Sequence, residues 1–226
     1  MTAAWIGLAG GVFAAVLSAW VALRQAKMAQ RVAELERAER AEEVLKRYRE
    51  PLAAAAFDLQ SRLYNILRMD FFQKFGGGER SDEAMSSTLF RLAQYFGWSE
   101  ILRRDIQFLS FPEDEDTMNV SDLQSQIAHC FLTDDHGHAL MIWNDEQRAL
   151  GELMIVEEHG KVLCMGYARF RNDRDGAFEP WLKRLRTELP DPGARERLRE
   201  VQHLLCELVE TLDSRKLRYR QDLGRA

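Results

Sequence analysis

The chain begins with a long run of apolar residues. No Asp, Glu, Lys or Arg occurs before Arg24, and Trp5 and Trp20 lie near the two ends of the run. In a helix that rises about 1.5 Å per residue, residues 3–23 would span about 30 Å, the thickness of the hydrocarbon layer of a bilayer. Tryptophan rings favour the two membrane interfaces. The pattern therefore predicts a transmembrane helix over residues 1–23.

Basic residues follow the apolar run directly and set its expected orientation. Arg24, Lys27 and Arg31 all precede the first acidic residue, Glu34. By the positive-inside rule, the N-terminus would lie outside the cell and the rest of the chain in the cytoplasm. We therefore expect a single-pass protein of the cell membrane, with the lipid bilayer as a partner. A cleaved signal peptide is the alternative, although such a peptide carries a positive side chain ahead of its apolar core and this chain does not.

Small residues recur on one face of the apolar segment. Gly7, Gly11 and Ala15 occupy every fourth position. In membranes this spacing allows two helix backbones to approach each other closely. We expect these three residues to form a helix–helix contact between two copies of the chain. The alternative is that an alanine-rich membrane helix produces the same spacing by chance.

A charged segment that favours helix follows at residues 24–50. It is rich in Ala, Glu, Arg, Lys and Leu, and it contains no Gly or Pro. Met28, Val32 and Leu35 follow the heptad spacing of a coiled coil, but the register breaks a few residues later. We expect a helical stalk, which is either a short parallel coiled coil that supports self-association or a solvated single helix.

Amphipathic helical patterns continue through a body at residues 51–213, and a basic tail follows at 214–226. Pro51 suits the first turn of a new helix, and Gly97 separates two helical patterns. Apolar spacing of about 3.6 residues predicts the helices, which cover residues 51–75, 81–96, 99–110, 121–132, 144–154, 178–189 and 194–216.

Two further local patterns concern helix ends and a hairpin. Ser121 with Gln124, and Asn144 with Gln147, match the capping box of a helix N-terminus. Residues 162–165 are apolar and follow His159-Gly160, which is typical of a short strand that pairs back across a turn. The expected fold is therefore mostly all-α, with a transmembrane helix, a stalk and a helical-bundle body that holds at most one small β-hairpin.

Composition excludes several classes of function. Of 226 residues, 46% are hydrophobic and 30% are charged, and the net charge is −5. A negative chain does not suit nucleic-acid binding, so we expect no nucleic-acid partner. Residues 76–78 are all Gly but lack the Gly-Lys-Ser/Thr of a phosphate loop, and no serine-hydrolase, zinc-protease or dinucleotide motif occurs. The sequence therefore predicts no catalytic residue and no cofactor, and an enzymatic function has no motif to support it.

The residues best suited to bind a metal ion lie at the end of the predicted helix at 121–132 and in the segment just after it. His129, Cys130, His136 and His138 are of the types that ligate zinc or iron, and acidic residues lie among them. Their spacing matches no standard zinc motif, and a single Cys is more often a core residue than a ligand. We therefore assign no metal ligand from the sequence and keep these four residues as weak candidates.

Three segments carry a resemblance to other proteins: Ser61–Leu67, Tyr95–Arg104 and Glu146–Met154. They resemble segments of a group of uncharacterised bacterial proteins. That group has an N-terminal transmembrane helix and a helical cytoplasmic body. The resemblance implies the same location and architecture for this chain, and it implies no activity and no site residue.

These patterns together favour a membrane-anchored interaction or scaffold protein. Its cytoplasmic body would present a surface, for example the acidic residues 113–116, to an unknown protein partner. A second hypothesis is a membrane-tethered sensor whose body binds a small ligand or a metal ion. A third is a hydrolase without a recognised motif.

Overall fold

The computed structural model describes residues 2–106, 115–173, 175–213, 218–219 and 223–226. Within these ranges the side chains of residues 2–19, 21, 37, 38, 40–42, 44–46, 106 and 115–117 are outside the description. The described chain is mostly helical, with one small antiparallel sheet, as the sequence predicts. Its elements are α1 (Thr2–Arg68), α2 (Phe71–Phe75), α3 (Ser81–Ile106), α4 (Glu115–Leu132), α5 (Asn144–Met154), β1 (Ile155–Glu158), β2 (Lys161–Cys164), α6 (Tyr167–Arg171), α7 (Glu179–Glu188), the 3-10 helix η1 (Pro192–Ala194) and α8 (Arg195–Leu212).

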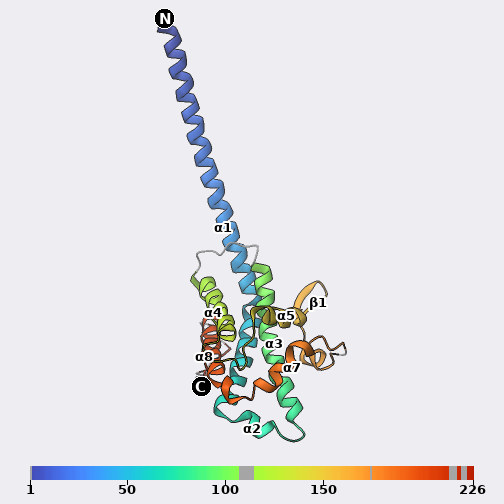
Figure 1. Ribbon diagram of the computed structural model, residues 1–226. Helices are drawn as coiled ribbons and strands as arrows, with labels where there is room; N and C mark the ends of the chain where they lie inside the picture. The colour runs from blue at the N-terminus through green and yellow to red at the C-terminus, as the bar shows by residue number, and fades with distance from the viewer. Residues whose placement is uncertain (1, 107–114, 174, 214–217, 220–222) are drawn as a thin grey trace.

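The first helix is the dominant feature of the molecule. Its N-terminal part projects from the body as a single rod, and its C-terminal part enters the bundle (Figure 1). Among the described side chains, no helix is long and apolar enough to cross a membrane. The proposed contact residues Gly7, Gly11 and Ala15, and most of segment 3–23, have side chains outside that description.

The prediction that Pro51 begins a new helix was wrong, because α1 runs through this residue without interruption. Proline inside a helix removes one main-chain hydrogen bond and crowds the preceding turn, at a cost of about 3 kcal/mol. Packing offsets that cost here: Tyr48 and Leu52, on either side of the proline, are buried in the body. The helix ends instead near Asp70, whose φ of 52° is left-handed.

The body is a bundle whose central member is the C-terminal part of α1. This part packs mainly against α8 and α3, while α4 packs against α8 and α5 packs against α3 (Figure 1). A single hydrophobic core joins these helices, and its fully buried members include Leu52, Leu59, Leu89, Ile127 and Leu205. The bundle therefore brings α4 and α8 side by side although they are far apart in sequence.

Helix α3 also runs through a predicted break. Gly97 lies inside this helix, where a Cβ atom would come within 2.6 Å of the Cys164 Sγ and 2.8 Å of the Met154 Cβ. On the facing helix α5, a Cβ on Gly151 would lie 2.7 Å from the carbonyl oxygen of Phe96. The glycine therefore marks a close crossing of α3, α5 and β2, and the prediction that it ends a helix was wrong.

The predicted hairpin is confirmed. Strands β1 and β2 pair antiparallel, with Ile155 opposite Cys164 and Glu158 opposite Lys161. His159 and Gly160 form the turn with φ values of 52° and 71°. Two positive φ values in a two-residue loop match the turn that suits the twist of a hairpin.

Both predicted capping boxes were placed wrongly. Helix α4 begins at Glu115, ahead of Ser121, and the intervening Val120 is buried in the core. At the start of α5 the Glu146 carboxylate, not Gln147, accepts a hydrogen bond of 2.8 Å from the Trp143 main-chain N–H. Gln147 instead turns inward and ties α4 to α5 through main-chain carbonyls.

Candidate metal site

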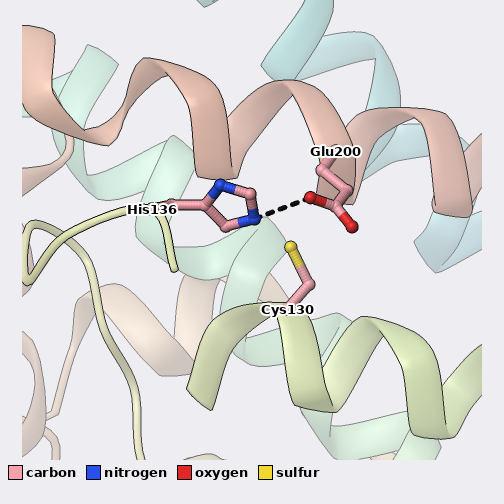
Figure 2. Close-up of side chains that lie close together, drawn as sticks. All are labelled: Cys130, His136 and Glu200. Carbon is pink, nitrogen blue, oxygen red and sulfur yellow. Dashed lines mark ion pairs between the residues drawn. The ribbon is translucent and has the colours of Figure 1, made fainter. Parts of the chain in front are cut away.

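Three side chains capable of binding a metal ion meet between α4 and α8. Cys130 lies in the last turn of α4, His136 in the loop that follows, and Glu200 on α8 (Figure 2). One ligand atom from each residue lies within 4.8 Å of the other two. The His136 Nε2 and a Glu200 carboxylate oxygen are 2.6 Å apart. The three residues therefore form a triangle of sulfur, nitrogen and oxygen ligands.

The orientation of the His136 ring decides between two kinds of chemistry. A cysteine–histidine–acid relay uses both ring nitrogens, one toward the thiol and the other toward the acid. In Figure 2 the Nε2 atom points toward Glu200, the Cys130 sulfur lies on that same side, and the Nδ1 atom faces away. Because the same nitrogen faces both Cys130 and Glu200, the arrangement suits three ligands around one metal ion. It does not suit a proton relay, which needs a different nitrogen for each partner.

The Cys130 thiol is held in its protonated form. Cys130 is 2% exposed, and its Sγ donates a weak hydrogen bond of 3.8 Å to the main-chain carbonyl of Arg197. Burial, together with the negative charge of Glu200, raises the pKa of Cys130 to about 12. The thiolate is the reactive form of cysteine, so this residue is a poor nucleophile at neutral pH. A bound metal ion would favour the thiolate by displacing the proton.

Arg197 fixes the loop that carries His136. Its side chain is completely buried, and its guanidinium donates hydrogen bonds to the main-chain carbonyls of Cys130, Gly137 and Ala139. The bonds to Gly137 and Ala139 measure 2.7 and 3.1 Å. Burial lowers the pKa of Arg197 from its ordinary value. Since Glu200 lies about one turn further along α8, the same helix supplies both a ligand and the support for the other two.

An open pocket of about 530 Å³ adjoins the triangle. Helix α4 lines it with Asp122, Ser125, Gln126 and His129, which recur at helical spacing and share one face. Helix α8 contributes Glu200 and Leu204. The Glu200 side chain is 52% exposed, whereas that of His136 is 17% exposed. Solvent and small solutes therefore reach the Glu200 carboxylate most easily, while Cys130, which also lines the pocket, is buried.

The structure separates the four weak candidates from the sequence. Cys130 and His136 come together in the triangle. His129 is exposed and lines the pocket, and His138 is exposed and belongs to neither the triangle nor the pocket lining. Glu200 is not among the candidates that the sequence offers, since a single Glu on a charged helix carries no signal. The three residues proposed to orient the membrane helix, Arg24, Lys27 and Arg31, have exposed side chains on the projecting part of α1.

No protein-family model matches the chain, and neither a curated protein nor a solved structure shows a significant similarity to it.

Proposed function

We propose that this chain is a membrane-tethered protein whose helical body binds a divalent metal ion through Cys130, His136 and Glu200. The observation that carries the proposal is the convergence of the three ligand atoms within 4.8 Å of one another. A buried Arg197 supports two of the three ligands, which is typical of a site whose ligands are held in place before the ion arrives.

Zinc fits this set of ligands best. Thiolate, imidazole and carboxylate are its three common protein ligands, and its preferred geometry has four ligands. Magnesium and calcium favour oxygen ligands and do not suit a thiolate. Three protein ligands beside an open pocket leave one position for water or a small solute. This arrangement favours an exchangeable ion, as in a sensor, over a sealed structural site.

The membrane tether rests on the sequence and on the shape of α1. The uncharged run before Arg24 is long enough for a bilayer, and Arg24, Lys27 and Arg31 favour a cytoplasmic body. The N-terminal part of α1 projects away from the bundle, so a bilayer has room to surround it (Figure 1). A body held at the inner face of the membrane would bind divalent metal ions from the cytoplasm.

An interaction or scaffold role is the second candidate. The observation that favours it is the exposure of Met28, Val32 and Leu35 on the projecting helix, where a protein partner would cover them. The hydrolase hypothesis receives no such support, because the Cys130 thiol is protonated at neutral pH and His136 directs a single nitrogen toward both neighbours.

Metal binding is tested on the full-length protein purified in detergent. The wild type is loaded with Co²⁺ as a spectroscopic substitute for Zn²⁺, and the thiolate-to-cobalt absorption in the near ultraviolet is recorded during competition with Zn²⁺. We expect one equivalent of metal per chain. Cys130→Ser should abolish the thiolate absorption, and Glu200→Gln should weaken binding at least about tenfold.

The matched pair His136→Ala and His138→Ala provides the control. Both histidines lie in the same loop, but only His136 belongs to the triangle. We expect the His136 variant to lose metal and the His138 variant to retain it. Equal metal content in the two variants, or a wild type without bound metal at micromolar concentrations, would overturn the proposal.

A further inference from the structure

The part of α1 that precedes the body exposes an apolar face. Among the described side chains of this helix, the first buried one is Tyr48. Before that point Met28, Val32 and Leu35 are 60%, 53% and 65% exposed. Removing a large apolar side chain from water lowers the free energy, so such a face favours binding to a partner that covers it. The position of this face, outside the bundle, leaves the metal site and the core free of that partner (Figure 1).

The three apolar residues lie on one side of the helix. Their spacings of four and three residues place Met28 and Leu35 at d positions of a heptad and Val32 at the a position between them. A β-branched residue at a with Leu at d favours two-stranded parallel coiled coils. On the opposite side, the Gln30 side chain donates a hydrogen bond of 3.0 Å to Glu34, so the outward face is polar.

The charges beside this face distinguish parallel from antiparallel pairing. In this register Arg31 is a g residue and Glu36 is the e residue of the next heptad. In a parallel pair, g of one helix faces the following e of its partner, so Arg31 would meet the partner's Glu36, twice by symmetry. In an antiparallel pair g faces g, which would bring Arg31 toward the partner's Arg31. Only the parallel arrangement is electrostatically complementary.

We propose that α1 forms a parallel two-stranded coiled coil with a second copy of this chain, with Met28, Val32 and Leu35 in the seam. The inference is independent of the metal site. The face is shorter than an autonomous coiled coil requires, so attachment of both copies to one membrane, which raises their local concentration, is part of the proposal. Because α1 continues into the body without a break, the pair would also hold two bodies side by side.

The test uses cysteine crosslinking of the full-length protein in membranes. Val32→Cys places a thiol in the seam, and Gln30→Cys places one on the polar outward face. The wild type reports any crosslinking through the three native cysteines, which are not linked to one another. Under mild oxidation we expect a disulfide-linked dimer for the Val32 variant and no dimer above the wild-type level for the Gln30 variant.

Charge reversal in the Val32→Cys background tests the direction of pairing. Arg31→Glu alone and Glu36→Arg alone should each lower the crosslinked fraction about twofold or more, and the double reversal should restore it. Arg31→Gln should lower the fraction of a parallel pair, which loses its contact with Glu36, but raise that of an antiparallel pair, which loses the repulsion between the two Arg31 side chains; a higher fraction for this variant would overturn the proposal. Equal crosslinking of the Val32 and Gln30 variants would overturn it as well, because the contact would then be random collision.

Discussion

The guanidinium of Arg197 donates a hydrogen bond to the main-chain carbonyl of Cys130, and this bond joins the last turn of α4 to α8. In return, the Cys130 thiol lies 3.8 Å from the carbonyl of Arg197. A buried arginine is costly unless its donors are satisfied, and here main-chain oxygens satisfy them. The pair thus connects the stability of the bundle to the geometry of the proposed metal site.

Replacement of this arginine should affect stability and metal binding together. Arg197→Lys keeps the charge but loses the planar fork, so at least one of the three carbonyls would be left buried without a donor. We expect a loss of about 2–4 kcal/mol in the free energy of unfolding, measured by urea denaturation of the metal-free protein. The metal affinity of the folded fraction should fall as well.

Arg199→Lys is the matched control for that experiment. Arg199 lies on the same helix, but it pairs with Glu196 at the surface, where an ion pair contributes little. We expect its unfolding midpoint and metal affinity to match those of the wild type. If Arg197→Lys behaved like this control, the buried arginine would not be a support of the site.

Close packing at Gly97 gives a second prediction. In Gly97→Ala the new methyl group would meet the Met154 Cβ, which cannot move without its backbone, and the Cys164 Sγ. We expect a loss of about 1–3 kcal/mol in the free energy of unfolding. Gly77→Ala, at a position with nothing within 4 Å and no left-handed φ, should be neutral or slightly stabilising. An equal effect of the two changes would contradict the crossing of α3 and α5.

The contrast between Gly97 and the hairpin shows what the sequence could predict. The turn at His159-Gly160 depends on local backbone preferences, and these were visible in the sequence. Gly97 and Pro51 also carry strong local signals, but neither is the helix boundary that those signals predict. Tertiary packing overrides the local preference at each of them, through Met154 at Gly97 and through Tyr48 and Leu52 at Pro51.

The candidate site was visible only in part for a similar reason. Cys130 and His136 lie close together in the sequence, so their ligand chemistry could be noticed. Glu200 joins them only because α8 packs against α4, and no spacing rule connects residues on two helices so far apart in the chain. The role of Arg197 could not be predicted from the sequence either, since a charged residue beside an apolar stripe is normally exposed.

Burial of Cys206 predicts a loss of stability at alkaline pH. Burial raises the pKa of this thiol to about 11, above the ordinary value of 9.0. Between these two values the unfolded chain loses the proton and the folded chain keeps it, so the free energy of unfolding falls as pH rises. The contribution is fully present below pH 9 and decreases by about 1 kcal/mol per pH unit up to pH 11.

Cys206→Ala isolates this contribution from other titrating groups. The wild type and the variant are unfolded in urea at pH 8, 9, 10 and 11, and the difference between their free energies of unfolding is compared across the series. Since alanine does not titrate, the variant should lose less stability than the wild type above pH 9. Parallel curves would show that Cys206 is not protected from ionisation in the folded protein.

The continuity of α1 through Pro51 gives the last prediction. In Pro51→Ala the main-chain N–H of residue 51 becomes available to the carbonyl of residue 47, and the crowding by the proline ring disappears. We expect a gain of about 1 kcal/mol in the free energy of unfolding, less than the full cost of an interior proline because alanine also increases the freedom of the unfolded chain. Thermal unfolding of the full-length protein, followed by circular dichroism, measures the change.

A proline in the first turn of a separate helix would be favourable, so a lower melting temperature for the variant would mean that the stalk and the body are two helices. A higher melting temperature supports a single helix that transmits any pairing of the stalk directly to the face of α1 that packs against α8.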